Sequence, residues 1–351
     1  MLTGTTDSAV AGTEITTTAE LTNGTIVTNL NKASIGTTKN WVQGTSSPVL
    51  NSECNGTTEV KMLCYNIFYL AQNDTYPITD RRTKVLDYLS DYIDQGVSVM
   101  ALQEVQANTW YSYLKEFVNS EGWAWSGYGR FGGTFEGYAT GATEASDAFN
   151  LIIYDPDKYI KVDEGHFWAS DTPSVKSAFY SLAYNYRVFN WIKLRDRATG
   201  EDFIFANVHL EETRSGTQTN QWGYTLDATT SSECRVKQAQ LISDQLAAQA
   251  VGGIPIIQAG DYNSAQGTDP YNKILETGYQ CVRDFAHVAD THGGYNAWNR
   301  ASTEKFAKGD HVFTSPLCTS DMYDVRAEDD IDEETGYHIS DHCPIYTTIQ
   351  Y

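Results

Sequence analysis

The sequence predicts an α/β fold in which buried strands alternate with amphipathic helices, and three observations support this class. Short apolar runs bounded by Gly, Asn or Asp recur from about residue 60 to the end, as the strands of a buried sheet do. Segments with apolar residues at helical spacing separate several of these runs. The 351 residues are 41% hydrophobic, enough for a large core, and no apolar run is long enough to span a membrane.

Residues 1–57 differ in composition from the rest and are expected to form a separate N-terminal segment before a main domain at 58–351. This segment is rich in Thr, Gly, Ser and Asn. Between Glu14 and Thr28, two strand-like runs flank Asn23-Gly24, a dipeptide typical of hairpin turns. The segment is therefore interpreted as a β-hairpin or a linker, and it contains no residues that point to chemistry.

The first part of the main domain is predicted to contain two strands, each followed by a helix. Lys61–Asn66 is a strand that ends in an amide, and Val97–Glu104 is a second core strand that ends in a carboxylate. Residues 80–95 present one apolar helical face. The helix after Glu104 has an apolar face made of Trp110, Leu114, Phe117 and Val118. Trp123–Tyr138, dense in Gly and aromatic residues, is expected to be a mobile loop.

Further strands and helices are predicted along the second part of the chain. The expected strands cover 149–154, 188–194, 203–209, a short run near Cys281, 310–313 and a last strand after Pro344. The expected helices cover 235–250 and a short stretch that ends at Gly278.

The stretch Ile254–Asn263 shows how such a strand delivers functional groups. Its apolar first half predicts a buried strand, and Asp261 and Asn263 follow at its end. Residues two apart in an extended chain face the same side, so the acceptor and the donor point together. In isolation, Asp and Asn after a strand usually form only a turn. The interpretation as a site depends on the same pattern elsewhere.

The pattern recurs. Apolar strands end in Asn66, in Glu104 and in His209, and two Asp-His dipeptides, Asp310-His311 and Asp341-His342, flank the last strands. A carboxylate that closes so apolar a strand as the one before Glu104 costs energy unless it is paired or bound to a cation. Oxygen ligands and histidines at one sheet edge suit a hard divalent cation and phosphate chemistry.

These residues resemble the endonuclease/exonuclease/phosphatase superfamily, which includes DNase I and bacterial sphingomyelinases. The resemblance runs from about residue 60 to the carboxyl end and implies a DNase I-like four-layer α/β sandwich, with two mixed sheets face to face and helices outside. Six motifs carry it in family order: Tyr65-Asn66, Leu102-Gln103-Glu104, Asn207-Val208-His209, Gly260-Asp261-Tyr262-Asn263, Gly309-Asp310-His311-Val312-Phe313 and Ser340-Asp341-His342-Cys343-Pro344.

The resemblance implies a metal site. Glu104 is expected to be the principal ligand, with Asn66 and Asp341 helping to hold the ion or its waters. Because these three side chains offer only oxygen, the expected ion is Mg²⁺ or Mn²⁺.

The resemblance also implies the groups that handle protons and phosphate. Asp261 would orient or deprotonate the attacking water, and Asn263 would bind the phosphate. His342, steered by Asp310, would contact the phosphate or act as acid and base. His209 would be the second histidine at the phosphate, although a lone histidine at a strand end is more often structural.

Three further residues have less defined roles. Arg187, which precedes a strand, is the candidate phosphate clamp. An acidic residue before the strand at 149–154 is common in the family, and Asp147 or Glu144 would serve, although neither has the usual spacing. His311 is expected either to touch substrate or to pack in the core.

The most direct reading is a divalent-metal-dependent phosphoesterase, most simply a phosphodiesterase. A non-specific endonuclease, a sphingomyelinase-like hydrolase and a non-catalytic protein that kept the fold are the alternatives. The net charge of −21 disfavours nucleic acid as the substrate. We expect a monomer, and the Thr-rich start favours a secreted or cell-surface location. Six cysteines without paired spacing leave the redox compartment open.

Overall fold

The computed structural model divides the chain into two compact units, Met1–Asn40 and Trp41–Tyr351. In the first unit, β1 (Thr18–Glu20) pairs antiparallel with β2 (Ile26–Thr28). The remainder of the predicted N-terminal segment lies outside the described residues, except for β3 (Trp41–Gln43). The structure describes residues 18–20, 26–28, 41–43, 58–71, 80–290, 292–298, 309–316, 318–326, 331–332 and 335–351.

Two large mixed sheets form the centre of the second unit. The first sheet has eight strands in the order β3, β15 (Val288–Asp290), β17 (Thr319–Val325), β18 (Ile345–Gln350), β4 (Glu59–Asn66), β5 (Val99–Gln106), β7 (Ala148–Tyr154) and β6 (Ala124–Ser126). The second sheet has six strands in the order β14 (Gln280–Cys281), β16 (Asp310–Thr314), β13 (Ile256–Asp261), β10 (Asp202–His209), β9 (Val188–Asp196) and β8 (Tyr159–Trp168).

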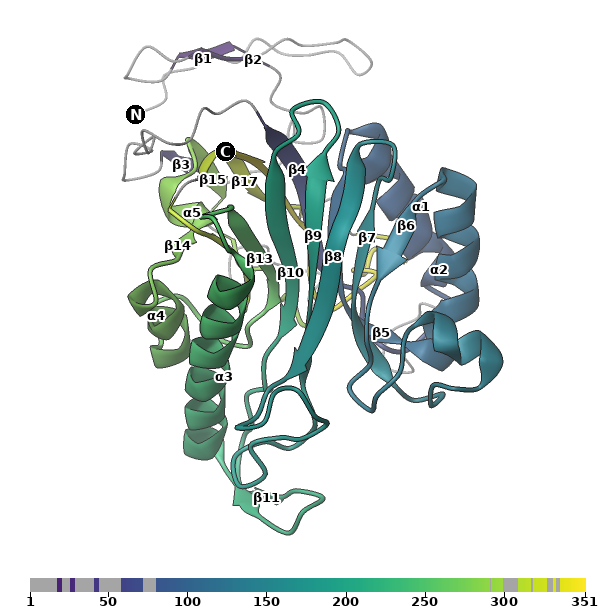
Figure 1. The fold of residues 1–351 in the computed structure, drawn as a ribbon, viewed down its shortest axis with the longest axis vertical. Coiled ribbons are helices and arrows are strands. Elements are labelled where there is room, and N and C mark those ends of the chain that lie inside the picture. The colour runs from purple at the N-terminus through teal and green to yellow at the C-terminus, as the bar shows by residue number, and fades with distance from the viewer. Residues whose placement is uncertain are drawn as a thin grey trace. The chain divides into compact units, whose positions relative to one another are not determined.

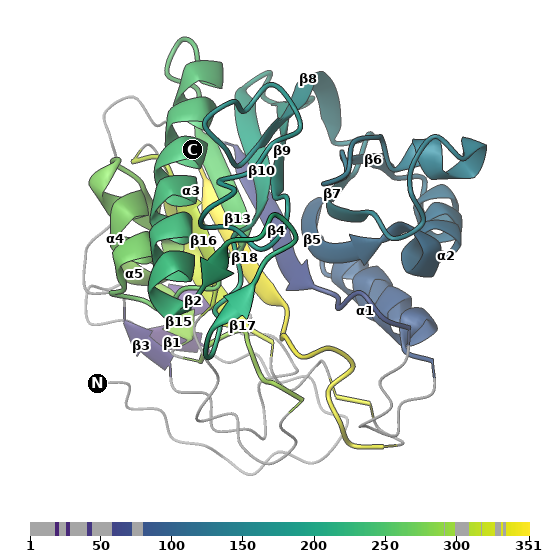
Figure 2. The ribbon, with the colours of Figure 1, turned by 90° about the horizontal axis from the view of Figure 1, so that it is seen from below.

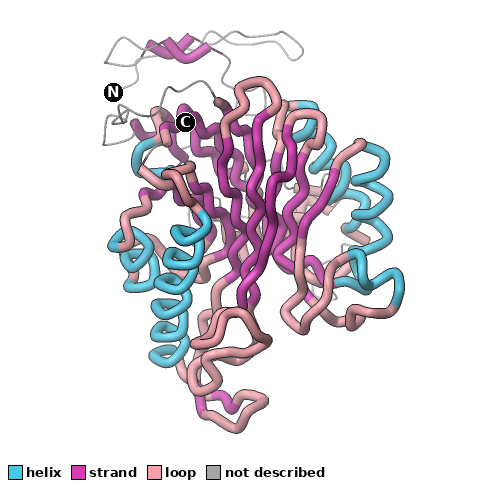
Figure 3. Tube along the Cα trace, in the orientation of Figure 1, coloured by secondary structure: helices cyan, strands magenta, loops and turns pink. Residues whose placement is uncertain are grey.

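Helices cover the outer face of each sheet, so that the unit has four layers (Figures 1 and 2). One apolar cluster joins the first sheet to α1 (Arg82–Asp94) and α2 (Ala107–Glu121). Another joins the second sheet to α3 (Ala228–Gln249) and α4 (Asp269–Glu276). A third fills the space between the sheets. Figure 3 shows strands inside and helices outside. The predicted DNase I-like α/β sandwich is confirmed, and none of the described helices is long and apolar enough to cross a membrane.

The remaining elements are short. The helix α5 (Val282–Phe285) directly follows β14, and β11 (Gln218–Thr219) pairs with β12 (Thr225–Leu226) beyond the second sheet. The helix expected over 235–250 starts earlier, at Ala228, because Asp227 caps it. The Asp227 carboxylate accepts the Thr230 amide at 2.9 Å, and the Thr230 hydroxyl accepts the Asp227 amide at 2.7 Å.

The expectation of a loop over Trp123–Tyr138 is wrong in part. The segment contains β6, which pairs with β7, and leads into a 3-10 helix at Glu136–Thr140. Its aromatic rings pack rather than face solvent: Trp125 and Phe135 meet edge to face with centroids 5.2 Å apart, and Phe135 is buried. Trp125 and Phe135 therefore belong to the core beside α2.

A buried amide connects the two sheets close to the predicted site. Asn207 of β10 donates from Nδ2 to the carbonyls of Leu102 on β5 and Leu151 on β7, at 2.9 and 2.8 Å. Its Oδ1 accepts from Gln103 Nε2 at 2.7 Å. Every polar atom of this buried side chain is therefore paired across the sheet interface, which fixes β10 against β5.

Gly260 provides the first prediction, because β13 runs parallel to β10 with Gly260 opposite Val208. A Cβ on Gly260 would lie 1.9 Å from the Val208 carbonyl oxygen, and this backbone atom cannot move without breaking the sheet. Gly260→Ala should lower the free energy of unfolding by about 3 kcal/mol, as overpacking does. Chemical denaturation measures this.

Gly309→Ala is the matched control, since its added Cβ would meet its nearest neighbour, Asp261 Oδ1, only at 3.6 Å. The control should unfold within about 1 kcal/mol of the native protein. Equal stabilities for the two variants would contradict the strand register described above.

Candidate functional site

Three neighbouring strands of the second sheet carry functional side chains to one edge. The register pairs His209, the last residue of β10, with Asp261, the last residue of β13. It also pairs Asp261 with Asp310, the first residue of β16. Adjacent strands in a sheet lie about 4.8 Å apart. The hydrogen-bonding pattern of the backbone therefore places an imidazole and two carboxylates side by side.

The first sheet contributes its groups from the facing edge. Asn66 ends β4, and Glu104 lies in β5 where the pairing with β7 is irregular. Glu104 has a φ of 60°, a left-handed conformation that a non-glycine residue adopts only under constraint. The irregularity turns this side chain away from the regular alternation of the strand. Asp341 and His342 precede β18, and Ser340 Oγ holds this turn by donating to the Asn66 carbonyl at 2.7 Å.

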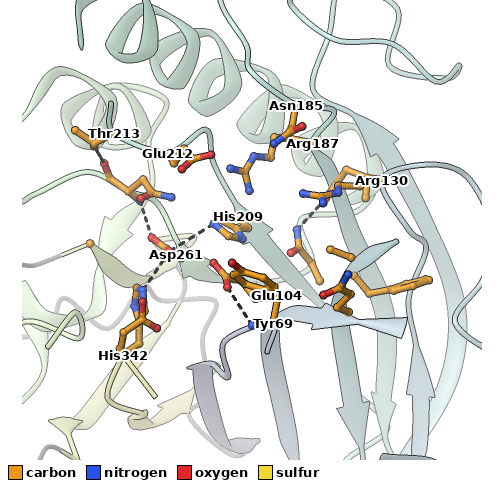
Figure 4. Close-up of a pocket in the computed structure, with 18 of the residues that line it drawn as sticks. Tyr69, Glu104, Arg130, Asn185, Arg187, His209, Glu212, Thr213, Asp261 and His342 are labelled. Carbon is orange, nitrogen blue, oxygen red and sulfur yellow. Dashed lines mark hydrogen bonds and ion pairs between the residues drawn. The ribbon is translucent and has the colours of Figure 1, made fainter. Parts of the chain in front are cut away.

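Asp261 is the centre of the polar contacts (Figure 4). Its Oδ2 accepts from Asn66 Nδ2 at 3.3 Å and lies 3.5 Å from His209 Nε2 and 3.7 Å from His342 Nε2. On the far side of the ring, His342 Nδ1 lies 2.9 and 3.0 Å from the two oxygens of Asp310. Asp310, His342 and Asp261 thus form a continuous chain of contacts, in which Asp310 sets the orientation of the imidazole.

The buried location of these groups shifts their pKa values in different directions. Burial raises the pKa of Asp261 to about 7, although the neighbouring His342 opposes this. Burial would lower the pKa of His342, but Asp310 and Asp261 outweigh it and raise that pKa well above its usual value. Burial and then Arg187 lower the pKa of His209 well below its usual value. The two shifts therefore run in opposite directions: the charged form is favoured for His342 and the neutral form for His209.

Two carboxylates near this chain suit a cation. Burial and the charge of Asp341 raise the pKa of Glu104, and burial also raises the pKa of Asp341. Asp341 Oδ1 is buried and accepts no hydrogen bond from any described residue. Two half-buried carboxylates that repel each other, one with a buried and unpartnered oxygen, fit a divalent ion, which would reverse both penalties.

A second set of donors is also close enough for a cation. Single donor atoms of Asp261, Asp310 and His342 lie within 4.8 Å of one another, and all three residues are buried. However, His342 Nδ1 is already paired with both oxygens of Asp310. A metal at this set would have to displace that pair, so Glu104 and Asp341 fit the ion better.

A cavity of about 820 Å³ opens above these groups. Asn263 faces it from a left-handed backbone, with a φ of 48°, that is held by a hydrogen bond from its amide to Asp261 Oδ1 at 2.8 Å. Arg187 faces it from the residue before β9, and its Nε lies 3.9 Å from the buried Glu211 carboxylate. The cavity thus has a basic end at Arg187, away from Glu104 (Figure 4), and the carboxylates Asp341 and Glu212 also line it.

The structure brings the predicted site residues together, while their chemical roles stay predictions. Seven of them line the cavity, and Asn66 and Asp310 lie directly behind it in contact with Asp261 and His342. The seven are Glu104, Arg187, His209, Asp261, Asn263, Asp341 and His342.

Two residues with less defined roles stay outside the cavity, and His311 follows the packing alternative. His311 does not line the cavity. Its Nε2 lies 2.8 Å from the Ser264 carbonyl, and its ring packs against Tyr262 and Tyr271. Asp147 does not line the cavity, and its Oδ1 accepts the Phe131 amide at 3.0 Å.

Several cavity residues had no motif in the sequence. Arg130 belongs to the Gly-rich segment that looked like a loop, and it reaches the cavity only because that segment folds back onto β7. No spacing or pattern along the chain indicates this. The other polar ones are Tyr69, Gln106, Ser146, Asn150, Asn185, Tyr186, Glu212, Thr213, Ser264 and Tyr295.

The chain belongs to the endonuclease/exonuclease/phosphatase family, whose sequence model matches residues 63–342. Members of this family are phosphatases and nucleases, and the protein is a phosphoester hydrolase by this membership. A comparison with curated protein sequences found no match.

Solved structures share the fold at low sequence identity. An endonuclease/exonuclease/phosphatase family protein from Bacteroides thetaiotaomicron is 20% identical, with a TM-score of 0.66 over 84% of this chain and 95% of that one. A mannosyl-6-phosphatase from the same organism is 21% identical, with a TM-score of 0.66 over 83% and 100%. D. rerio TDP2 complexed with a single-strand DNA product is 16% identical, with a TM-score of 0.53 over 84% and 100%.

The Asp310–His342 pair provides the second prediction. In metal-free protein, Asp310→Asn should bring the pKa of His342 down, because the substitution removes the carboxylate that favours the charged ring. NMR titration of the ring protons measures this. The same variant should lower kcat by about 10²- to 10⁴-fold, the usual contribution of a positioned acid or base.

Asp321→Asn is the control, since the exposed Asp321 lies 3.1 Å from Nδ1 of a different histidine, His287. This control should leave both the His342 titration and turnover unchanged. If His342 titrates in Asp310→Asn as it does in the native protein, Asp310 does not stabilise the charged ring.

Proposed function

We propose that the protein is a divalent-metal-dependent hydrolase of small, accessible phosphoesters. The observation that carries this proposal is the juxtaposition of two half-buried carboxylates, Glu104 and Asp341, with the Asp310–His342–Asp261 chain at one side of the cavity. The bound cation would be Mg²⁺ or Mn²⁺, and it would neutralise the phosphate oxygens that otherwise repel a nucleophile.

The residues of this chain then have separate tasks. Glu104, Asp341 and the Asn66 amide hold the ion or its waters. Asp261 accepts the proton of the attacking water, for which a pKa of about 7 is well matched to neutral pH. His342, kept protonated by Asp310, donates to the phosphate or to the leaving oxygen.

The phosphate itself meets three neutral or cationic donors. His209 is neutral and donates a hydrogen bond without competing for the water proton. The Asn263 side chain and the Arg187 guanidinium complete the set from two other strand ends. Preorganised donors of this kind stabilise the charge that develops on the phosphate in the transition state.

The charge distribution supports a small substrate over a long duplex. Several surface cations are already paired with carboxylates: Arg82 with Asp80 at 2.8 Å and Arg195 with Asp202 at 2.6 Å. A protein that binds duplex DNA usually neutralises several phosphates with free Lys and Arg. With 24 basic against 45 acidic residues, the chain offers few such contacts. Nuclease activity should therefore be weak and unspecific.

A phospholipid headgroup is the second candidate, on one observation. Tyr69 and Leu70 are 43% and 40% exposed, and Tyr69 lines the cavity beside Glu104. Two adjacent exposed apolar side chains at the rim of a site suit contact with a lipid surface. The patch is small, so a soluble phosphodiester or phosphomonoester remains the first candidate.

Glu104→Ala should abolish hydrolysis and weaken Mg²⁺ binding while the fold persists. We expect the Mg²⁺ affinity to fall by more than about 100-fold. Loss of a residue that only hydrogen-bonds to a metal ligand already lowers metal affinity by about 10- to 100-fold, and loss of the ligand itself should cost more. Isothermal titration calorimetry with Mg²⁺ measures this, and circular dichroism checks the fold.

Glu233→Ala serves as the control, since Glu233 is an exposed carboxylate on α3. The control should bind Mg²⁺ as the native protein does. If the Mg²⁺ affinity of Glu104→Ala equals that of the native protein, Glu104 is not a ligand.

A further inference from the structure

Arg130 at the basic end of the cavity has no task in the mechanism described above. It lines the same cavity as Glu104 and Arg187. Figure 4 shows it on the far side of Arg187 from Asp261 and His342. The Arg130 guanidinium therefore stands away from the groups that would act on the scissile phosphate.

The backbone of Arg130 is fixed from three directions. Its amide donates to the Ala148 carbonyl on β7 at 3.3 Å, and its carbonyl accepts from Trp168 Nε1 on β8 at 3.3 Å. The next amide, of Phe131, donates to Asp147 Oδ1 at 3.0 Å. An arginine on so restrained a turn presents its guanidinium at a defined place in the cavity, as a binding group must.

Asp147, Glu104 and Glu212 favour the charge of Arg130 only from a distance. No carboxylate of the described residues forms an ion pair with it, and its Nε is buried without a hydrogen-bond partner. Burial lowers the pKa of Arg130, and the like charge of Arg187 lowers it further. Arg187, by contrast, has Glu211 behind it at 3.9 Å. A half-buried guanidinium beside another cation costs free energy that a bound anion would recover.

The side chains around Arg130 are polar and uncommitted. Gln106, Ser146 and Asn185 also line the cavity, and none of them forms a side-chain hydrogen bond with the described residues. Gln106 pairs with Ala148, whose carbonyl accepts the Arg130 amide. Their amide and hydroxyl groups offer donors and acceptors of the kind that hydroxylated ligands use. The cavity, at about 820 Å³, holds far more than one phosphate.

We propose that Arg130, with Gln106, Ser146 and Asn185, forms a second subsite that binds an anionic group on the hydroxylated part of the substrate, beyond the phosphate that is hydrolysed. This inference rests on the proposed function and narrows its substrate class. The preferred substrate is a small polyol or sugar phosphoester that carries a second negative charge. A cationic headgroup such as choline meets Arg130 and Arg187 and is rejected.

Two probes that differ only in the second charge test this. Sorbitol 6-phosphate and 6-phosphogluconate share one hydroxylated chain, but the second ends in a carboxylate. Calorimetric titration of the metal-free protein, which cannot turn the probes over, gives the dissociation constant of each with native protein, Arg130→Gln and Arg195→Gln. Arg195→Gln is the matched control, because Arg195 is an exposed arginine paired with Asp202 away from the cavity.

The native protein should bind 6-phosphogluconate about tenfold more tightly than sorbitol 6-phosphate, the usual scale of one charge-assisted contact. The ratio should fall to about one in Arg130→Gln and stay at about ten in Arg195→Gln. Equal binding of the two probes by the native protein, or the same ratio in Arg130→Gln, overturns the subsite. The titration measures binding and does not depend on turnover. A protein that binds the probes as expected but hydrolyses no phosphoester would contradict the proposed function and not the subsite.

Discussion

The site depends on one constraint, the parallel register of β10 against β13. That register sets His209 beside Asp261, and the antiparallel pairing of β13 with β16 sets Asp310 next in line. The register is possible only because Gly260 has no Cβ, which would otherwise lie 1.9 Å from the carbonyl of Val208. Backbone hydrogen bonds, which are strong and inflexible, thus position the three groups, and the loops only complete the arrangement.

Local backbone strain and desolvated charge, contributed by both sheets, also shape the site. Glu104 and Asn263 both adopt left-handed backbone conformations, at φ values of 60° and 48°, that the surrounding strands enforce. Such conformations cost about 1–3 kcal/mol each and persist where a site requires them. Burial of Glu104, Asp261 and Asp341 raises the pKa of each carboxyl, and a bound cation would offset that cost. The strained backbone and the desolvated carboxyl groups therefore lower the stability of the fold at this edge, as is common at functional sites.

The sequence predicted most of the cavity residues near Asp261 but few of those near Arg130. Strands that end in Glu104, His209 and Asp261 are visible as apolar runs followed by a polar residue, because burial on both faces demands such runs. Strand order was not visible, since pairing depends on contacts distant in sequence. The strand β8 was missed because five consecutive residues of its ten are exposed and its burial does not alternate. Arg130 was missed because the fold of its segment onto β7, not its spacing, brings it to the cavity.

The central claim is that the protein hydrolyses a small phosphoester at this cavity with the help of a divalent cation. The most direct measurement is turnover of p-nitrophenyl phosphate, bis(p-nitrophenyl) phosphate and duplex DNA by the purified protein, each with Mg²⁺ and with excess chelator. We expect at least one small ester to be hydrolysed with Mg²⁺, activity to disappear with chelator and return on adding Mg²⁺, and duplex DNA to be cut slowly. Hydrolysis that is indifferent to the chelator, or efficient cutting of duplex DNA alone at physiological salt, would contradict the account.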